Sequence, residues 1–113
     1  MARTVHARFV ASEEELIATF LTGADDALDV LVDRYRPVVG ALVDHHDPSG
    51  ARRHRLVHEA MLGLWDAICA YRPEDGPFAP LALRCIRRHL LAATAAPPPS
   101  HGRLERFRVL LRD

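Results

Sequence analysis

Apolar side chains recur every three or four residues between positions 56 and 68, which is the repeat of an amphipathic helix. The residues of this row are Leu56, Val57, Ala60, Met61, Leu64, Trp65 and Ile68. At about 3.6 residues per turn, the row covers more than three turns. Nowhere does the chain alternate between apolar and polar residues, as a half-buried strand does, for more than a few positions. The sequence therefore predicts an all-α fold, a single small helical bundle of four or five helices.

Two further helices are predicted before this row. Ser12 followed by Glu15 is a capping-box pattern at a helix start, and Gly23 is typical of a helix end. The second of these helices begins near Asp25. Pro37 lies inside its apolar pattern, so we expect that helix to kink or restart there.

Turn-forming residues separate the central row from its neighbours. Residues 47–50 (Asp-Pro-Ser-Gly) and residues 71–77 contain the Pro, Gly and Asp typical of turns. A fourth helix is predicted to start near Phe78 or Pro80. Its inward side chains are predicted to be Leu83, Ile86, Leu90 and Leu91.

The length of 113 residues is enough for one domain. We assign residues 1–96 to the helical domain and residues 97–113 to a Pro-rich spacer and a short C-terminal amphipathic helix. No stretch approaches the roughly 20 apolar residues of a membrane span, and the N-terminus lacks the apolar run of a secretory signal. These features predict a cytoplasmic protein with no membrane partner. Cys69 and Cys85 are predicted to be buried free thiols, because both have apolar surroundings.

The formal charge of zero hides a strong asymmetry along the chain. Residues 1–50 hold four Arg and nine acidic residues, a balance of −5, whereas residues 51–113 hold eleven Arg and six acidic residues, a balance of +5. This permits an anionic partner on the C-terminal half, and equally permits the two halves to pack on each other. The chain has no Asn or Gln, so direct recognition of adenine would require other side chains.

Residues suited to catalysis or metal binding form no recognisable motif. None of the three serines, Ser12, Ser49 and Ser100, stands beside an obvious base, and no glycine-rich phosphate loop is present. His54 and His58 have a spacing that can hold zinc, but a site needs three or four convergent ligands. The sequence predicts a protein that is not an enzyme, with no cofactor, no metal site and no small-molecule substrate.

Four segments follow, in order, the pattern of a known family. Residues 27–39 (ALDVLVDRYRPVV) are similar to the family's A-x-x-x-L-[VF]-x-R-Y-x-P-L-V, and residues 56–68 (LVHEAMLGLWDAI) to its L-V-Q-E-G-M-x-G-L-W-x-A-I. Residues 71–76 (YRPEDG) are similar to Y-[DN]-P-x-x-G, and residues 78–88 (FAPLALRCIRR) to F-x-x-[FY]-A-x-x-x-I-x-R. The chain thus resembles region 2 of the sigma-70 family of bacterial transcription initiation factors, with its sporulation and stationary-phase members as the nearest type. The resemblance covers about residues 13–95, and no stretch resembling region 4 of the family follows.

The resemblance implies a transcription initiation or regulation protein that docks on the clamp helices of the RNA polymerase β′ subunit and contacts −10 promoter DNA. The residues expected to contact the polymerase or another protein partner are Arg55, His58, Glu59 and Leu62. The residues expected to contact DNA are Phe78, Arg84, Arg87 and Arg88. Arginines neutralise phosphates, and an aromatic ring can stack on a flipped base. Trp65, by contrast, is expected in the core, since it lies within the apolar row.

The docking signature departs from the family pattern. Where the family has Asp-Leu-Val-Gln-Glu, residues 55–59 read Arg-Leu-Val-His-Glu, so only Glu59 persists. An inverted charge at a docking contact changes the choice of partner. Two hypotheses stay open: a sigma-like protein that acts through RNA polymerase and promoter DNA, and a sigma-derived decoy or regulator that binds another regulatory protein and no longer melts promoter DNA.

Overall fold

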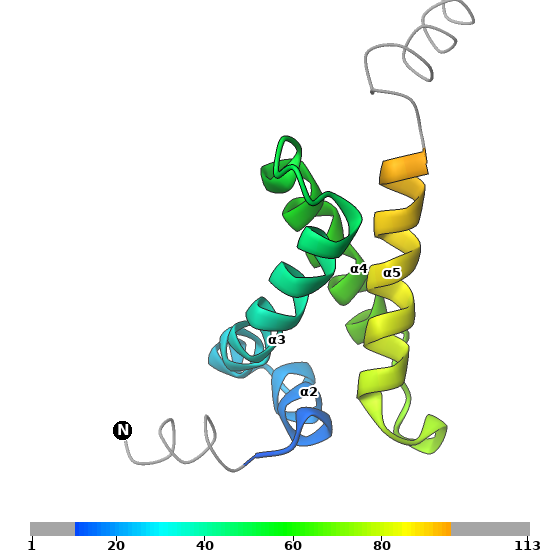
Figure 1. The fold of residues 1–113 in the computed structure, drawn as a ribbon. Helices are drawn as coiled ribbons and strands as arrows, with labels where there is room; N and C mark the ends of the chain where they lie inside the picture. The colour runs from blue at the N-terminus through cyan, green and yellow to red at the C-terminus, as the bar shows by residue number, and fades with distance from the viewer. Residues whose placement is uncertain (1–10, 96–113) are drawn as a thin grey trace, which may run out of the picture.

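The computed structural model describes residues 11–95, which form helices joined by short turns (Figure 1). With the labels of Figure 1, the elements are α2 (Glu13–Leu21), α3 (Asp25–His46), α4 (Arg53–Ala70), the short 3-10 helix η1 (Pro73–Asp75) and α5 (Phe78–Ala95). No strand occurs within residues 11–95, and the predicted all-α bundle is confirmed there. The spacer and last helix predicted for residues 97–113 lie outside the described residues.

The capping box predicted at Ser12 forms at the start of α2. The Ser12 hydroxyl accepts a hydrogen bond from the backbone N–H of Glu15 at 3.0 Å, and the Ser12 N–H donates to the Glu15 carboxylate at 3.0 Å. Two N–H groups that the helix itself leaves unpaired are thereby satisfied. Gly23 follows the helix with φ of +108°, a left-handed conformation that glycine adopts without strain.

Helix α3 continues through Pro37 without a restart. Proline has no N–H to donate to the carbonyl of Asp33, so one backbone hydrogen bond of the helix is missing. Pro37 faces solvent, where water can bond to that carbonyl. The position of the proline on the exposed side explains why the helix does not break there.

The turn predicted at residues 47–50 connects α3 to α4 and is organised by Asp47. One oxygen of its carboxylate accepts from the Ser49 hydroxyl at 2.7 Å, and the other accepts from the Arg52 N–H at 2.8 Å. These donors stabilise the ionised form and hold the pKa of Asp47 below its ordinary value. Asp44 and Arg53 form an ion pair across the same turn.

Helices α4 and α5 lie side by side and run in opposite directions (Figure 1). Gly63 makes this close approach possible: a Cβ atom at that position would lie 2.8 Å from the carbonyl oxygen of Cys85 and 2.8 Å from Cα of Ile86. Helices α4 and α5 therefore pack closely on each other at Gly63. Only a glycine fits at the point of contact without moving one helix.

Two carboxylates of α2 tie it to the rest of the bundle. Glu14 accepts a hydrogen bond from the backbone N–H of Phe78 at 2.7 Å, so it caps α5 from a distant part of the chain. Glu13 accepts from the Tyr35 hydroxyl at 2.8 Å. Burial and this hydrogen bond both raise the pKa of Tyr35. The first turn of α2 thus links α3 and α5.

Helices α2, α3, α4 and α5 all contribute side chains to the core. Its largest fully buried side chains are Phe78, Leu16, Ile17, Leu31, Leu56, Leu64, Ile86, Leu90, Val39 and Val43. Some predictions about burial are wrong. Leu91 is 58% exposed, Leu83 is only half-buried and lies outside the core cluster, and Cys69 is exposed although Cys85 is buried as predicted. Leu91 and Cys69 each follow a buried residue, and a step of one residue turns the side chain by about 100° around the helix.

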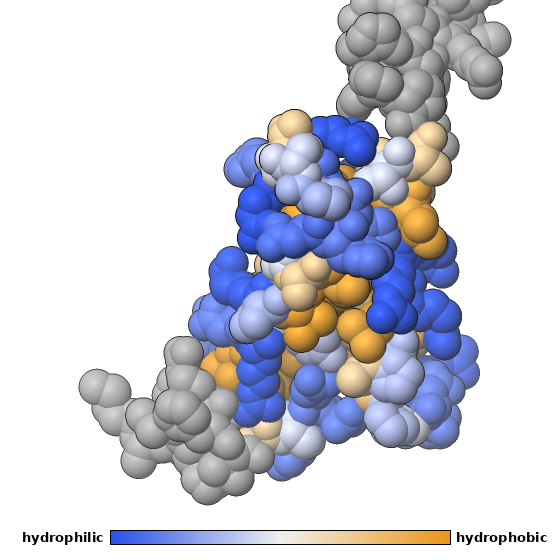
Figure 2. Space-filling view, in the orientation of Figure 1, coloured by the Kyte–Doolittle hydropathy of each residue, from blue (hydrophilic) through white to orange (hydrophobic). Residues whose placement is uncertain are grey.

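Apolar residues also reach the surface. On the face shown in Figure 2 they gather over the middle of the molecule, between α3 and α5, with hydrophilic residues around them. Among the helices of residues 11–95, none has both the length and the apolar character that crossing a membrane requires.

Candidate functional site

One side of α4 faces away from the core and carries the four residues predicted to contact a protein partner. Arg55, His58, Glu59 and Leu62 follow one another at intervals of three, one and three residues, so they share one helix side. His58 and Leu62 are exposed, whereas Arg55 and Glu59 are half-buried. The structure brings these four residues together, and we call them the α4 docking face.

His89 of α5 binds two acidic side chains of α4. Its Nε2 lies 2.6 Å from a carboxylate oxygen of Asp66, and its Nδ1 lies 3.5 Å from one of Glu59. Glu59 and Asp66 are two helical turns apart, and the imidazole bridges them. The acid that the chain shares with the family's docking signature is therefore held by a residue of the neighbouring helix. Local sequence patterns do not indicate this contact, because 30 residues separate Glu59 from His89.

Arg55 differs from the other members of the α4 docking face because part of its guanidinium group is buried. Its Nη1 atom is shielded from solvent and has no hydrogen-bond partner among residues 11–95. A buried donor without an acceptor raises the free energy of a structure, by about 1–3 kcal/mol for typical groups.

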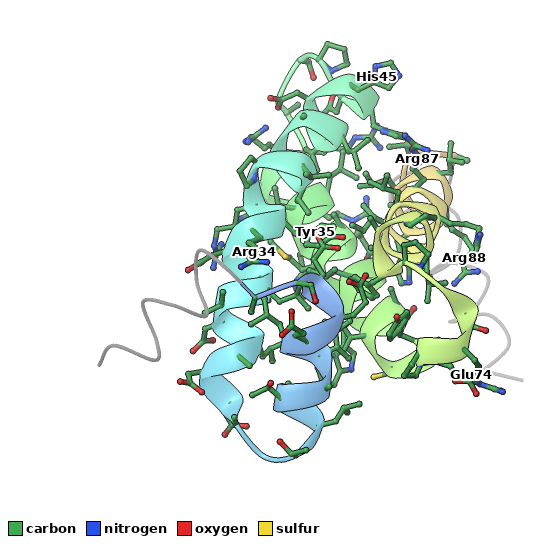
Figure 3. All side chains as sticks on the ribbon, turned by 90° about the horizontal axis from the view of Figure 1, so that it is seen from below. Arg34, Tyr35, His45, Glu74, Arg87 and Arg88 are labelled. Atoms are coloured by element: carbon green, nitrogen blue, oxygen red, sulfur yellow. The ribbon has the colours of Figure 1, made fainter. Side chains whose placement is uncertain are left out.

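The outward side of α5 combines basic and apolar residues. Arg84, Arg87 and Arg88 are all exposed, as their predicted role requires, and Figure 3 shows Arg87 and Arg88 projecting from α5. Arg88 also lies 3.8 Å from the Cys85 sulfur. The same side of the helix carries Ala79, Pro80, Leu83 and Leu91. Guanidinium groups beside apolar side chains suit a ligand that has both phosphates and flat apolar groups.

Comparison with known proteins shows the family to which the chain belongs. Residues 31–94, more than half of the chain, match the family model for Sigma-70 region 2. The chain belongs to the sigma-70 region 2 family. The match includes all of α4 and almost all of α5, so both candidate surfaces lie inside it. The resemblance to region 2 of the sigma-70 family, predicted from the sequence, is thereby confirmed.

Two curated relatives carry the name RNA polymerase sigma-H factor. The one from Bacillus licheniformis is 34% identical over 82 residues, which are 72% of this chain and 37% of the relative. The one from Bacillus subtilis (strain 168) is 33% identical over 82 residues, which are 72% of this chain and 38% of the relative. The region 2 domain thus spans well under half the length of these relatives. No solved structure matches the chain.

Phe78 is fully buried, unlike the arginines with which the sequence groups it. Its ring packs edge-on against Tyr35 at 6.0 Å and against Tyr71 at 5.4 Å between ring centres. Stacking on a base would require this ring to leave the core. The structure therefore removes Phe78 from the DNA-contacting residues: it is the first residue of α5 and fills the space under the preceding turn.

The prediction that Trp65 lies in the core is wrong, because this side chain is 44% exposed. Its ring packs edge-on against Phe20 of α2, at 6.0 Å between ring centres. It follows the buried Leu64 by one residue, which turns it from the core toward a groove between α3 and α4. This groove has a volume of about 240 Å³. Periodicity alone could not separate Trp65 from its buried neighbours.

Histidines of the region 2 domain do not assemble a metal site in the described part of the chain. Among residues 11–95, no three His, Cys, Asp or Glu side chains converge as a group that could hold a metal ion. His54 and His58 are both exposed on α4, and the rings of His45 and His46 pack edge-on at 5.7 Å at the end of α3.

Proposed function

We propose that this region 2 domain acts in transcription initiation, in the bacterial cytoplasm, by docking on the clamp helices of the RNA polymerase β′ subunit. The observation that carries the proposal is the α4 docking face, which covers the family's docking signature and presents the exposed side chains of His58 and Leu62. Leu62 is 40% exposed there and supplies an apolar contact. The names of the two curated relatives, both RNA polymerase sigma factors, support the same partner.

On this proposal, the outward side of α5 contacts −10 promoter DNA. Arg84, Arg87 and Arg88 would bind phosphates of the displaced strand, which supplies affinity without reading the sequence. Leu83 and Leu91 lie beside them and offer apolar contacts to bases. No aromatic residue lines this side of α5 among the described residues, so base capture by stacking is weaker here than the family pattern implies.

A second function, that of a sigma-derived regulator or decoy, is favoured by the chemistry of Arg55 and Glu59. The family has an acid at the position of Arg55, whereas here a buried guanidinium nitrogen has no acceptor among the described residues. Glu59 is held by His89 instead of being free for a partner. An arginine where the family has an acid suits a partner that presents an acidic group, which would be a regulatory protein other than the polymerase.

Binding of the full chain to purified core RNA polymerase and to an isolated clamp-helix fragment tests the first proposal. Leu62→Arg places a charge at the centre of the α4 docking face. We expect it to weaken binding by at least about tenfold, which corresponds to about 1.4 kcal/mol. The matched control is Leu21→Arg, because Leu21 is 67% exposed at the end of α2. Absence of binding at micromolar concentration, or equal weakening in both variants, contradicts the proposal.

The double variant Arg55→Asp with His58→Gln separates the two functions, because it restores the family's docking signature. A working sigma region 2 binds the polymerase before this change. A decoy or regulator gains polymerase binding only after it. Binding that appears only in the double variant therefore supports the second function and contradicts the first.

DNA binding is tested with a fluorescent single strand of −10 promoter sequence. Replacing Arg84, Arg87 and Arg88 with Ala should lower affinity and flatten its salt dependence, by about 0.7 in log–log slope for each phosphate that is no longer neutralised. Arg72→Ala is the control, since Arg72 is exposed in the turn before α5. An unchanged salt slope in the triple variant contradicts a phosphate-binding role for α5.

A further inference from the structure

The groove between α3 and α4 has apolar walls and is open to solvent. Its lining residues are Leu28, Val32, Arg36, Met61, Leu64, Trp65 and Ile68. Trp65 is 44% exposed there, and its ring packs edge-on against Phe20. An indole ring left this open gains free energy when a second apolar surface covers it, because large aromatic side chains bury a large area.

One border of the groove is acidic. Asp25, Asp29 and Asp33 form a row at four-residue intervals on α3, beside the parallel row that begins with Leu28 and Val32. Asp25 and Asp29 are exposed. Neither makes a side-chain hydrogen bond or ion pair with another of the described residues. Asp33 pairs with Arg36 at 3.0 Å. The segment that fits this groove best is therefore an amphipathic one, with basic residues next to its apolar side.

The chain itself contains such a segment in residues 103–112. Leu104, Phe107 and Leu111 stand at intervals of three and four residues, so they would share one side of a helix. The basic residues of the segment are Arg103, Arg106, Arg108 and Arg112, against one acid, Glu105. Its composition is complementary both to the apolar lining and to the acidic border of the groove.

The length of chain before this segment fits the distance to the groove. Because α4 and α5 are antiparallel, α5 ends at Ala95 near the first turn of α4. Along the axis of α4, the start of the helix and Trp65 are about 12 residues apart, or about 18 Å at 1.5 Å per residue. Trp65 also lies about 200° around α4 from Gly63, which contacts α5, so the chain has to pass around α4 as well. Residues 96–103, three of them Pro, reach about 25 Å at 3.1 Å per residue in an extended proline-type conformation. With about 18 Å used along the axis, a fully extended linker keeps about 17 Å of sideways reach, and α4 is about 10–12 Å across. The segment can therefore reach the groove of its own molecule only with its linker nearly extended.

We propose that residues 103–112 dock intramolecularly in the α3–α4 groove, with Leu104, Phe107 and Leu111 against Trp65 and arginines beside Asp25 and Asp29. Docking itself does not depend on the function proposed above. Trp65 is one turn beyond Leu62 on α4, so a docked segment would border the α4 docking face. If that face binds the polymerase, the docked segment also restricts access to it.

Trp65 is the only tryptophan of the chain, so its fluorescence reports directly on the groove. The test is acrylamide quenching of the full chain. The triple variant Leu104→Ser, Phe107→Ser and Leu111→Ser should roughly double the quenching constant, since docking would cover about half of the exposed ring. Val109→Ser is the matched control, because Val109 falls on the opposite side of the same helical pattern and its replacement should leave quenching unchanged.

The acidic border supplies an independent variant within the folded domain. Asp29→Asn should raise the quenching constant by a smaller amount than the triple variant, and Asp26→Asn, also exposed on α3, should not. Circular dichroism and thermal unfolding of every variant establish that the bundle stays folded. Equal quenching in the wild type and the triple variant overturns the proposal. Shielding of Trp65 that grows with protein concentration also overturns it, because a second copy would then be the occupant.

Discussion

At the scale of single residues, Gly63 determines how closely α4 and α5 can approach. In Gly63→Ala the new methyl group would lie 2.8 Å from two backbone atoms of α5, and backbone cannot rotate away as a flexible side chain can. We expect a loss of about 1–3 kcal/mol in the free energy of unfolding, the usual range for overpacking. Gly40→Ala is the control, because its methyl group meets only the end of the Arg53 side chain, at 3.4 Å. Denaturant unfolding should find Gly40→Ala at least as stable as wild type, since Ala favours helix by about 0.8–1 kcal/mol. Equal stability of the two variants would contradict this prediction, because it would show that α4 and α5 can move apart to accommodate the methyl group without a loss of stability.

Asp47 gives a second prediction for a single residue, in the pH dependence of stability. The Ser49 hydroxyl and the Arg52 N–H lower its pKa from the ordinary 3.8. The ionised form therefore stabilises the folded state above pH 3.8, and this contribution is lost as the pH falls through the lower folded pKa. Wild type should be more stable than Asp47→Asn at pH 7, and the difference should shrink below about pH 3.8. If the difference in stability between wild type and Asp47→Asn stayed constant down to the pH of acid unfolding, the charge of Asp47 would not be its cause.

At the scale of helices, α5 depends on a cap supplied by α2. Glu14→Ala removes the acceptor for the Phe78 N–H, and we expect a loss of about 0.5–2 kcal/mol in the free energy of unfolding, as for other helix caps. Thermal unfolding followed by circular dichroism measures it. The control is Glu74→Ala, because Glu74 is an exposed acid in the turn before α5. If Glu14→Ala and Glu74→Ala lose the same free energy of unfolding, the loss comes from removing a negative charge and not from removing the cap.

The helices could be predicted from the sequence because the information is local. Ser12 with Glu15, the apolar row of α4 and the turn residues at 47–50 and 71–77 each act within a few positions of one another. The fine placement of side chains could not be predicted, because it depends on which helices meet. Periodicity places Trp65 in the core, and the family resemblance assigns Phe78 to DNA. In the structure Trp65 is 44% exposed, whereas Phe78 is buried against Tyr35 of α3. Long-range contacts such as Glu14 with Phe78 leave no trace in spacing.

At the scale of the whole molecule, the acidic half of the chain both supports the bundle and supplies exposed charge. Glu13 and Glu14 reach α3 and α5 through hydrogen bonds, while Asp25 and Asp29 stay exposed on α3, and Arg84 and Arg87 of the basic half stay exposed on α5. Much of the charge asymmetry along the sequence is thus displayed on the surface. This explains why composition indicated charged surfaces but could not show which residues form them.

The junction at Tyr35 makes the whole bundle sensitive to alkaline pH. Tyr35 joins α3 to Glu13 of α2 and to the Phe78 ring of α5, and its pKa is raised above the ordinary 10.0, by burial first and by the hydrogen bond to Glu13 next. An unfolded chain releases this proton near pH 10, whereas the folded chain keeps it, so the unfolded state binds fewer protons there and stability falls as the pH rises.

Denaturant unfolding should show that the free energy of unfolding declines from about pH 9 upward, with tyrosinate absorbance appearing together with the loss of helical signal. Tyr35→Phe should be less stable at pH 7, because Glu13 loses its donor, yet its stability should fall less steeply with pH. Tyrosinate from both tyrosines near pH 10, with full helical signal retained, would show that the junction opens without unfolding the bundle.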